Sequence, residues 1–352
     1  MLTDKQVAEI HEHLEKAQNP VFYYDNDADG LCSYVLLRRF IDRGKGVAVR
    51  SFPDLNEGYA RKAAELNADY VFVLDKPVLS KEFVEAISDL SLPIVWIDHH
   101  DVSSENFSSI ENFFEYNSAK SGDKKGEPVT YLSYKISGRK EDAWLGVVGC
   151  IADHYLPDFA SEFAEKFPEF WKDGVKEPFD AYFGTEIGRI ARAVNFGLKD
   201  SITNVIRLQN FLISCKGPAE VFEESGKNQD FRKKYLDIKV KYEMLLRRAR
   251  MNEKGRILFF EYSGDLSISA DLANELSYLY SKKYIVVAYV KGNIANLSMR
   301  GKNVRDVLAK VLKVIFGSGG GHEGAVGARI SASDLKKFRE VFEREIGEGN
   351  QD

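Results

Sequence analysis

Acidic side chains and imidazoles follow three short apolar segments in the first hundred residues of the chain. Carboxylate oxygens and imidazole nitrogens are ligands that divalent cations accept in proteins. Two such ions held about 3.5–4 Å apart can activate a water molecule and polarise a phosphoryl group. The side chains in question are Asp25, Asp27, Asp29, Asp75, Asp98, His99 and His100. Their types therefore predict a binuclear metal site.

The apolar segments that precede these residues have the pattern of buried strands. Residues 21–24, 70–74 and 94–97 are short runs rich in β-branched and aromatic side chains, and helical stretches alternate with them. This pattern is typical of a parallel sheet, whose ligands collect at the carboxyl ends of the strands. The sequence thus predicts an α/β fold with the metal site at one edge of the sheet.

Each motif also has a simpler explanation. The spacing from Asp25 to Gly30 fits a calcium-type loop or an acidic turn that caps a helix. A lone acid after a strand, such as Asp75, is more often a cap than a ligand. The His99-His100 pair is harder to explain structurally, because two adjacent buried imidazoles would need partners. Taken together, the three segments favour a metal site.

Five motifs in this order resemble the DHH phosphoesterases, specifically the RecJ-like nucleases and their two-domain relatives. The motifs are Asp25 to Gly30, Asp75, Asp98 to His100, Gly149 with Asp153, and a glycine run at 319–321 that ends in His322. The resemblance extends over nearly the whole chain. It implies a parallel-sheet DHH domain at 1–185, a helical linker at 186–254, and a smaller α/β DHH-associated domain at 255–346.

The same resemblance implies roles for the residues of the first domain. Asp75 would bridge two divalent cations, with Mn²⁺ preferred and Mg²⁺ as the alternative. His100 would contact the scissile phosphate or assist the leaving group, and Asp98 would orient an imidazole. The expected catalytic residues are therefore Asp75, Asp98 and His100. The expected metal ligands are Asp25, Asp27, Asp29, Asp75, His99 and Asp153.

The second domain is expected to bind the rest of the substrate. Its glycine run would expose backbone N–H groups that a phosphate can approach closely, although a flexible turn would have the same composition. Related proteins also carry a Ser-x-Arg element that contacts substrate. The expected contacts are Ser298, Arg300, Gly319, Gly320, Gly321 and His322.

The second motif departs from the family pattern. Relatives often follow its acid with a small residue, whereas Lys76 and Pro77 follow Asp75 here. A cation beside the site and a stiffened turn should alter substrate contacts more than metal binding. All acids and histidines of the pattern are present, which favours an active enzyme.

A basic segment from Lys227 to Arg250 is expected to form a long linker helix. Apolar residues recur in it at spacings of three and four, so one face can pack while the cations point away. Such a face can be merely solvated, or it can track a nucleic-acid backbone. The cations are Lys227, Arg232, Lys233, Lys234, Lys239, Lys241, Arg247, Arg248 and Arg250.

The bulk properties are those of a cytoplasmic enzyme. The 352 residues suit two domains, and the net charge of −5 fits a carboxylate-rich cleft. Three widely spaced cysteines predict buried thiols and no disulfide framework. No apolar run is long enough to be a signal peptide or a membrane span, so no membrane association is expected.

These observations favour a metal-dependent exonuclease that releases mononucleotides from single-stranded DNA or RNA. An alternative is a phosphoesterase for short oligonucleotides, nucleotide bisphosphates or cyclic dinucleotides. An alternative of another class is a non-catalytic adaptor in replication or repair that partners a helicase or replisome. The sequence leaves polarity and sugar preference open and predicts no oligomeric state.

Overall fold

A computed structural model describes residues 1–51, 54–102, 105–121 and 126–348 of the chain. Within it the chain divides into two compact units, Met1–Tyr235 and Leu236–Asp352. The division falls inside helix α11 (Gln229–Met251). Among the described residues, no helix is both long enough and apolar enough to cross a membrane.

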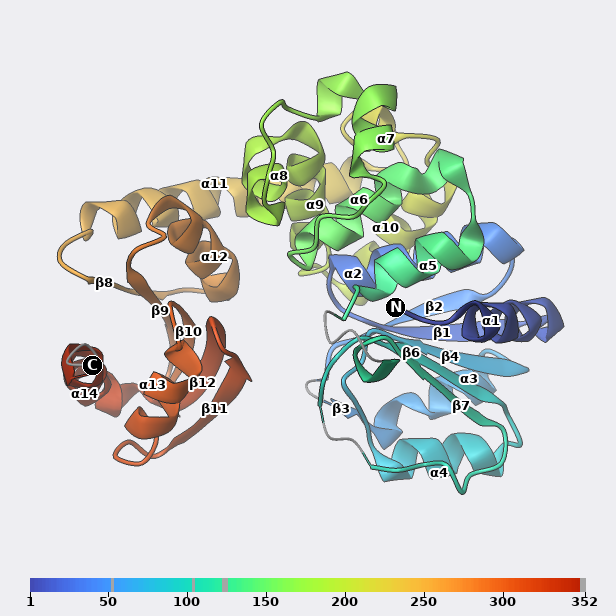
Figure 1. The fold of residues 1–352 in the computed structure, drawn as a ribbon, viewed down its shortest axis with the longest axis horizontal. Coiled ribbons are helices and arrows are strands. Elements are labelled where there is room, and N and C mark those ends of the chain that lie inside the picture. Colours follow the sequence, from blue (N-terminus) through green and yellow to red (C-terminus); the bar gives the residue numbers. More distant parts are fainter. Residues whose placement is uncertain (52–53, 103–104, 122–125, 349–352) are drawn as a thin grey trace. The chain divides into compact units, whose positions relative to one another are not determined.

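The N-terminal unit is built on a five-stranded parallel sheet in the order β2-β1-β4-β6-β7 (Figure 1). The three strands expected from the sequence, β1, β4 and β6, are neighbours at its centre. Their buried, β-branched and aromatic side chains suit a sheet that is covered on both faces. The strands are β1 (Pro20–Asp25), β2 (Lys45–Val49), β4 (Tyr70–Leu74), β6 (Ile94–Asp98) and β7 (Phe113–Asn117).

Helices cover both faces of this sheet (Figure 1). On one face, α3 (Arg61–Glu65) and α4 (Lys81–Asp89) pack on the central strands, and Phe83 and Ile87 of α4 join the core around Trp96. Ser80 caps α4 by accepting a hydrogen bond from the backbone N–H of Phe83. On the other face lie α2 (Ala28–Ile41), α5 (Val129–Ser137) and α6 (Ala143–Ala152).

The chain begins with helix α1 (Asp4–Lys16). A short parallel pair of strands, β3 (Asp54–Leu55) and β5 (Val78–Leu79), lies outside the five-stranded sheet. Residues 156–250 are mainly helical, as expected. They contain α7 (Ala160–Lys166), α8 (Pro178–Gly184), α9 (Glu186–Gly197), α10 (Ile202–Ser214) and α11.

The C-terminal unit has a second sheet, in the order β11-β12-β10-β9-β8. Strands β8 and β9 are parallel and the other pairs are antiparallel. One face packs on α13 (Val304–Val311) and α14 (Leu335–Glu348), and its core contains Leu297, Met299 and Phe338. The other elements are β8 (Ile257–Ser263), α12 (Ser269–Leu279), β9 (Tyr284–Lys291), β10 (Ile294–Arg300), β11 (Gly317–His322) and β12 (Ala325–Ser331).

The predicted fold class is confirmed: a parallel α/β unit is followed by helices and a smaller α/β unit. The glycine run, which resembled a turn in composition, forms the edge strand β11 instead. The three cysteines are buried and unpaired, as predicted. The proposed domain limits at residues 185 and 254 stay predictions; they lie next to the start of α9 and the end of α11.

Candidate functional site

The carboxyl ends of β1, β4 and β6 bring the predicted acids to one edge of the N-terminal sheet. Asp25 and Asp98 are the last residues of β1 and β6, and Asp75 directly follows β4. Asp27 caps helix α2, where its carboxylate accepts a hydrogen bond from the backbone N–H of Gly30 at 2.9 Å. Asp153 lies at the end of α6. The edge therefore gathers side chains from five elements.

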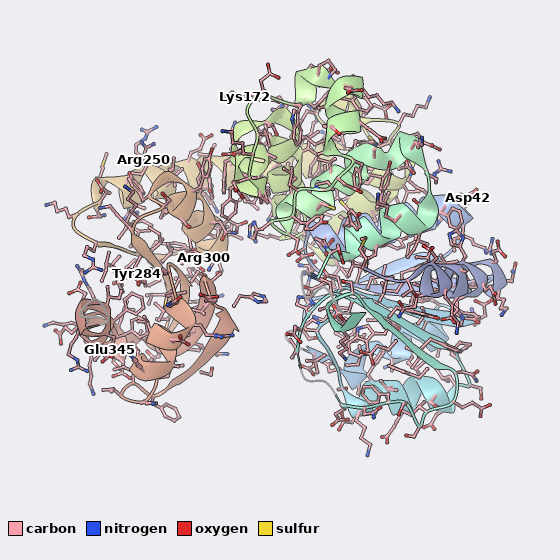
Figure 2. All side chains as sticks on the ribbon, viewed as in Figure 1. Asp42, Lys172, Arg250, Tyr284, Arg300 and Glu345 are labelled. Carbon is pink, nitrogen blue, oxygen red and sulfur yellow. The ribbon has the colours of Figure 1, made fainter. Side chains whose placement is uncertain are left out.

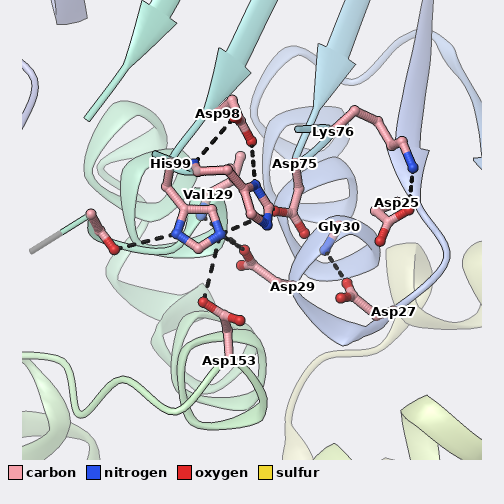
Figure 3. Close-up of polar contacts among 12 residues, drawn as sticks. Asp25, Asp27, Asp29, Gly30, Asp75, Lys76, Asp98, His99, Val129 and Asp153 are labelled. Carbon is pink, nitrogen blue, oxygen red and sulfur yellow. Dashed lines mark hydrogen bonds and ion pairs between the residues drawn. The ribbon is translucent and has the colours of Figure 1, made fainter. Parts of the chain in front are cut away.

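His99 is the centre of the cluster (Figure 3). Its Nε2 atom lies 3.3 Å from Asp75 Oδ1 and 3.6 Å from Asp153 Oδ2. It lies 4.0 Å from Asp29 Oδ2. His99 Nδ1 lies 3.3 Å from the carbonyl oxygen of Gly126, which leaves Nε2 directed at the acids. Asp29, His99 and Asp153 are spaced to hold a metal ion, as are Asp75, His99 and His100.

His100 has a different environment from its neighbour. Its Nδ1 lies 2.8 Å from Asp98 Oδ1, and its backbone N–H donates to Asp98 Oδ2 at 3.1 Å. Burial opposes protonation, but the hydrogen bond and charge of Asp98 prevail and raise the pKa of His100 to about 8. Because its Nδ1 is held by Asp98, His100 is better placed to hold a proton than to bind a metal through that atom.

Burial and mutual repulsion raise the pKa of three carboxyl groups in the cluster. Burial, followed by the charges of Asp29 and Asp27, holds the pKa of Asp75 well above its usual range. Burial likewise raises the pKa of Asp27 to about 8 and that of Asp153 to about 7. Asp75 Oδ1 is buried and has no hydrogen-bond partner among the described residues. A divalent cation would satisfy this oxygen and relieve the repulsion, so the donor set fits such an ion.

The backbone of Asp75 is also unusual. Its φ angle is +60°, in the left-handed region that a non-glycine residue rarely adopts. Its backbone N–H still donates a hydrogen bond to the carbonyl oxygen of Ile97 in β6. The unusual φ angle therefore does not interrupt the hydrogen bonding between the two strands. Left-handed residues cost about 1–3 kcal/mol and are concentrated at functional sites.

Asp29 has a structural role in addition to its place in the cluster. Its two carboxylate oxygens accept hydrogen bonds from the backbone N–H groups of Val129 and Thr130, at 3.0 and 2.7 Å. These N–H groups form the start of α5, where a negative charge is favourable. Gly149 of α6 packs against Thr130 so closely that a Cβ atom would overlap its side chain. The glycine of the fourth motif thus allows α5 and α6 to meet beside Asp29 and Asp153.

Asp25 is paired with the cation that the sequence placed beside the site. Lys76 is fully buried, and its Nζ lies 2.8 Å from Asp25 Oδ1 and 2.9 Å from the carbonyl oxygen of Ser51 (Figure 3). Asp25 and Asp27 belong to neither of the two ion-sized groups found among the described residues. The structure therefore gathers Asp29, Asp75, His99 and Asp153 more closely than the two acids of the first motif.

Four of the six predicted substrate contacts, Ser298, Arg300, Gly320 and His322, share one face of the C-terminal sheet. Ser298 is paired with Gly327, which in turn is paired with Gly320. In the same way, Arg300 is paired with Ala325, which in turn is paired with His322. Residues that are directly opposite in an antiparallel sheet point to the same face. We call this surface the polar sheet face; its members are Asn296, Ser298, Arg300, Ser318, Gly320, His322, Ala325, Gly327 and Arg329.

Helix α12 fixes the β10 side of the polar sheet face. Ser298 Oγ lies 2.9 Å from Ser269 Oγ, and Arg300 Nε donates to the Asn274 side chain at 2.7 Å. Burial lowers the pKa of the Arg300 guanidinium to about 10. Figure 2 shows Arg300 on this sheet. Gly319 and Gly321 alternate with Gly320 along β11, so they belong to the opposite face.

Residues 253–348 match the family model of the DHHA1 domain. The matched residues run from β8 to α14 of the C-terminal unit, and we call this part the DHHA1 domain. The sequence matches no curated protein. The polar sheet face is therefore a feature of the DHHA1 domain, and its β11 edge carries the predicted glycine run.

Solved structures show that the chain has the same fold as RecJ and a related DHH-domain protein. RecJ from Thermus thermophilus with Mn²⁺ is 14% identical, with a TM-score of 0.67 over 98% of this chain and 55% of that one. A manganese-bound exonuclease RecJ is also 14% identical, with a TM-score of 0.65 over 98% and 94%. A DHH domain described as belonging to a family of ribosomal proteins is 15% identical, with a TM-score of 0.68 over 97% and 89%. The chain thus spans about half the length of the Thermus protein.

The sequence did not predict the positions of two residues, one at the acid cluster and one on the polar sheet face. The sequence placed Lys76 near the metals but did not predict its burial against Asp25. Arg329 was not singled out, yet it is exposed on the polar sheet face of the DHHA1 domain, opposite Asn296 and Ser318. Its position in an alternating strand, 325–331, was the available signal.

Proposed function

We propose that the protein is a metal-dependent phosphodiesterase that releases mononucleotides from the end of a single strand of DNA or RNA. The observation that carries this proposal is the carboxylate cluster around His99, in which Asp29 and Asp75 are buried and Asp75 Oδ1 has no hydrogen-bond partner among the described residues, beside the protonatable His100. The RecJ-type fold supports the proposal. A divalent cation, Mn²⁺ by preference, would supply Lewis acidity when bound.

The residues of the chain have distinct parts in this proposal. Asp29, Asp75, His99 and Asp153 would hold the cations, and Asp25 and Asp27 would complete the ligand set. Asp98 fixes the orientation of His100 and keeps its imidazole protonated at neutral pH. His100 can then donate a hydrogen bond or a proton to the phosphate or to the oxygen that leaves.

The polar sheet face supports a nucleotide as the second part of the substrate. Arg300 and Arg329 can attract phosphate, and Gly320 leaves the backbone of β11 open, since a Cβ atom there would meet nothing within 4 Å. Ser298 and His322 add hydrogen-bonding groups on the same face. Phosphate contacts of this kind position a strand without reading its sequence.

The proposal is tested by digestion of end-labelled single strands in Mn²⁺. We expect mononucleotides from a 24-mer, with Asp75→Asn as the inactive control. Comparison of DNA with RNA and of 5′ with 3′ labels would identify the sugar and the direction. Absence of hydrolysis by the parent protein with both Mn²⁺ and Mg²⁺ would contradict the proposed activity.

A short oligonucleotide or dinucleotide is the second candidate substrate, and the ion pairs of α11 favour it. Four of the nine cations in the basic segment are paired with acids: Arg232 with Glu224, Lys234 with Asp200, Lys239 with Glu243, and Lys241 with Asp265. A bound strand would have to displace these acids, so the paired cations contribute somewhat less to its affinity than unpaired cations would.

A salt titration separates the two substrates. If α11 follows a long strand, replacement of Lys233, Lys234 and Arg248 by Gln should flatten the dependence of 24-mer affinity on salt. Cleavage of a dinucleotide should not change. An unaltered salt dependence, together with faster cleavage of a 3-mer than of a 24-mer, would favour the short substrate.

A further inference from the structure

An open groove lies along the edge of the N-terminal sheet, formed by residues other than those of the metal cluster. Strand β2 is the edge strand, and its only strand partner among the described residues is β1. The groove has a volume of about 600 Å³. It is lined by Gly44 and the β2 residues Lys45 to Ala48, by residues of α2 and α10, and by residues between Gly58 and Leu66.

The α10 wall is apolar although it faces solvent. Ile202 and Ile206 are 67% and 45% exposed, and they are one helical turn apart. Val205 and Ile213 continue the apolar lining. Exposed isoleucines beside an unpaired strand edge would promote aggregation unless a partner covers them.

The charged residues of the groove are all cations. Arg38, Lys45, Arg50 and Lys62 line it, and no described acid does. Arg38 and Lys62 have acidic neighbours in Asp42 and Glu65, but these acids are 96% and 40% exposed, and ion pairs with such exposed partners are weak enough for a ligand to replace. Lys45, on the edge strand itself, is exposed.

We propose that this groove binds an extended, acidic segment of a partner protein, which adds a strand to β2. The open edge of β2 supplies backbone hydrogen bonds. Alternate side chains of the added segment would point toward α10, where apolar residues fit Ile202 and Ile206. Acidic residues would pair with the cations of the rim. The apolar helical wall favours a peptide over a nucleic acid, because isoleucine gives bases no aromatic surface for stacking. Two tyrosines also line the groove, but Tyr34 is only 2% exposed, and the hydroxyl of Tyr59 accepts a hydrogen bond from the backbone N–H of Arg50.

The probe is a library of random displayed 12-residue peptides, selected against the full-length protein. We expect enrichment of peptides in which apolar residues alternate, with Asp or Glu nearby. A fluorescein-labelled copy of a selected peptide should bind with a Kd of about 10 μM or better, and more weakly at high salt. Failure to enrich any peptide, or enrichment of basic peptides, would overturn the proposal.

Variants locate the binding site. Ile206→Glu and Lys45→Glu should each weaken peptide binding by about tenfold or more. The matched controls Val240→Glu and Lys81→Glu change residues that are also exposed, at 68% and 60%, but lie outside the groove. Thermal melts would confirm that all four variants fold. Equal binding by Ile206→Glu and the parent protein would place the peptide elsewhere and overturn the proposal.

Backbone methylation tests whether the peptide forms a strand. N-methylation of alternate residues on one edge of the peptide should abolish binding, while methylation of the other edge should not, because only one edge faces β2. If neither set had an effect, strand addition would be wrong. A labelled single-stranded 24-mer that displaces the peptide, or a dimer that Ile206→Glu dissociates in sedimentation, would instead assign the groove to nucleic acid or to a second copy of the chain. Either result would overturn the proposal.

Discussion

Asp75 in the N-terminal unit is 3% exposed, in a cluster of acids that repel one another, whereas Arg329 in the DHHA1 domain is exposed on an open sheet. The first arrangement is unfavourable for folding until a cation is present, because buried like charges raise each other's pKa values. The exposed charge of Arg329 stays in contact with water, so it opposes folding little. Under the proposed function the reacting groups would be buried and the groups that bind the rest of the substrate would be exposed, so mutations in the two units should have different effects.

The largest effect should follow the replacement of Asp75 by Asn. This change preserves the volume of the side chain but removes the charge nearest to His99 Nε2. We expect Mn²⁺-dependent hydrolysis to fall by at least about a thousandfold, equivalent to about 4 kcal/mol. The metal-free variant should melt no lower than the parent protein, because a repelled carboxylate has been removed. Rates and melting curves measure both effects, and substantial residual hydrolysis would contradict the role of Asp75.

Substitutions of His99 and His100 should affect metal binding and turnover differently. His99→Gln should lower both metal content and rate, because its Nε2 faces three carboxylates. His100→Gln should lower the rate but keep most of the metal, because its Nδ1 is held by Asp98. Metal analysis after gel filtration, together with kcat, distinguishes the variants. Equal loss of metal in both would show that the roles are assigned wrongly.

A pH effect of intermediate size is expected in metal-free protein. The folded-state pKa values of Asp27, Asp153 and His100 are raised, to about 8, 7 and 8. Groups with raised pKa values bind more protons in the folded state, so stability is lost as pH rises through those values. Melting temperatures measured in EDTA should therefore fall between pH 5.5 and 9. Excess Mn²⁺ should oppose this trend because cations bind the deprotonated carboxylates. A melting temperature that rises with pH in EDTA would be the contrary result.

The smallest effect should come from the polar sheet face. Arg329→Gln should raise KM for a single strand by about fivefold and leave kcat and the melting temperature unchanged, because one phosphate contact is lost. Arg344→Gln, on the exposed surface of α14, is the matched control. A decrease in kcat without a change in KM would instead show that the polar sheet face takes part in the chemical step.

The same comparison explains what could be predicted from the sequence. Asp25, Asp75 and Asp98 were predictable as neighbours because they end buried strands of a parallel sheet. The bonds from Asp29 to Val129 and Thr130 were not, because they join residues about a hundred positions apart.

The C-terminal sheet and the groove beside β2 were also not predictable from the local sequence. Strand β11 was missed because glycine has a low strand propensity and gives no alternating pattern. Its register against β12, which places Gly320 and His322 with Arg300, depends on pairing that local sequence does not encode. The groove beside β2 likewise depends on α10, some 150 residues further along the chain.

Calorimetric titration of Mn²⁺ into EDTA-treated, dialysed protein is the most direct test of the metal centre. The account predicts saturable binding by the parent protein, with release of protons from the carboxyl groups whose pKa values are raised. It predicts binding at least about a hundredfold weaker in Asp75→Asn and nearly unchanged binding in His100→Gln. Absence of saturable Mn²⁺ binding by the parent protein, or equal binding by Asp75→Asn, would contradict the claim that these residues form a metal centre.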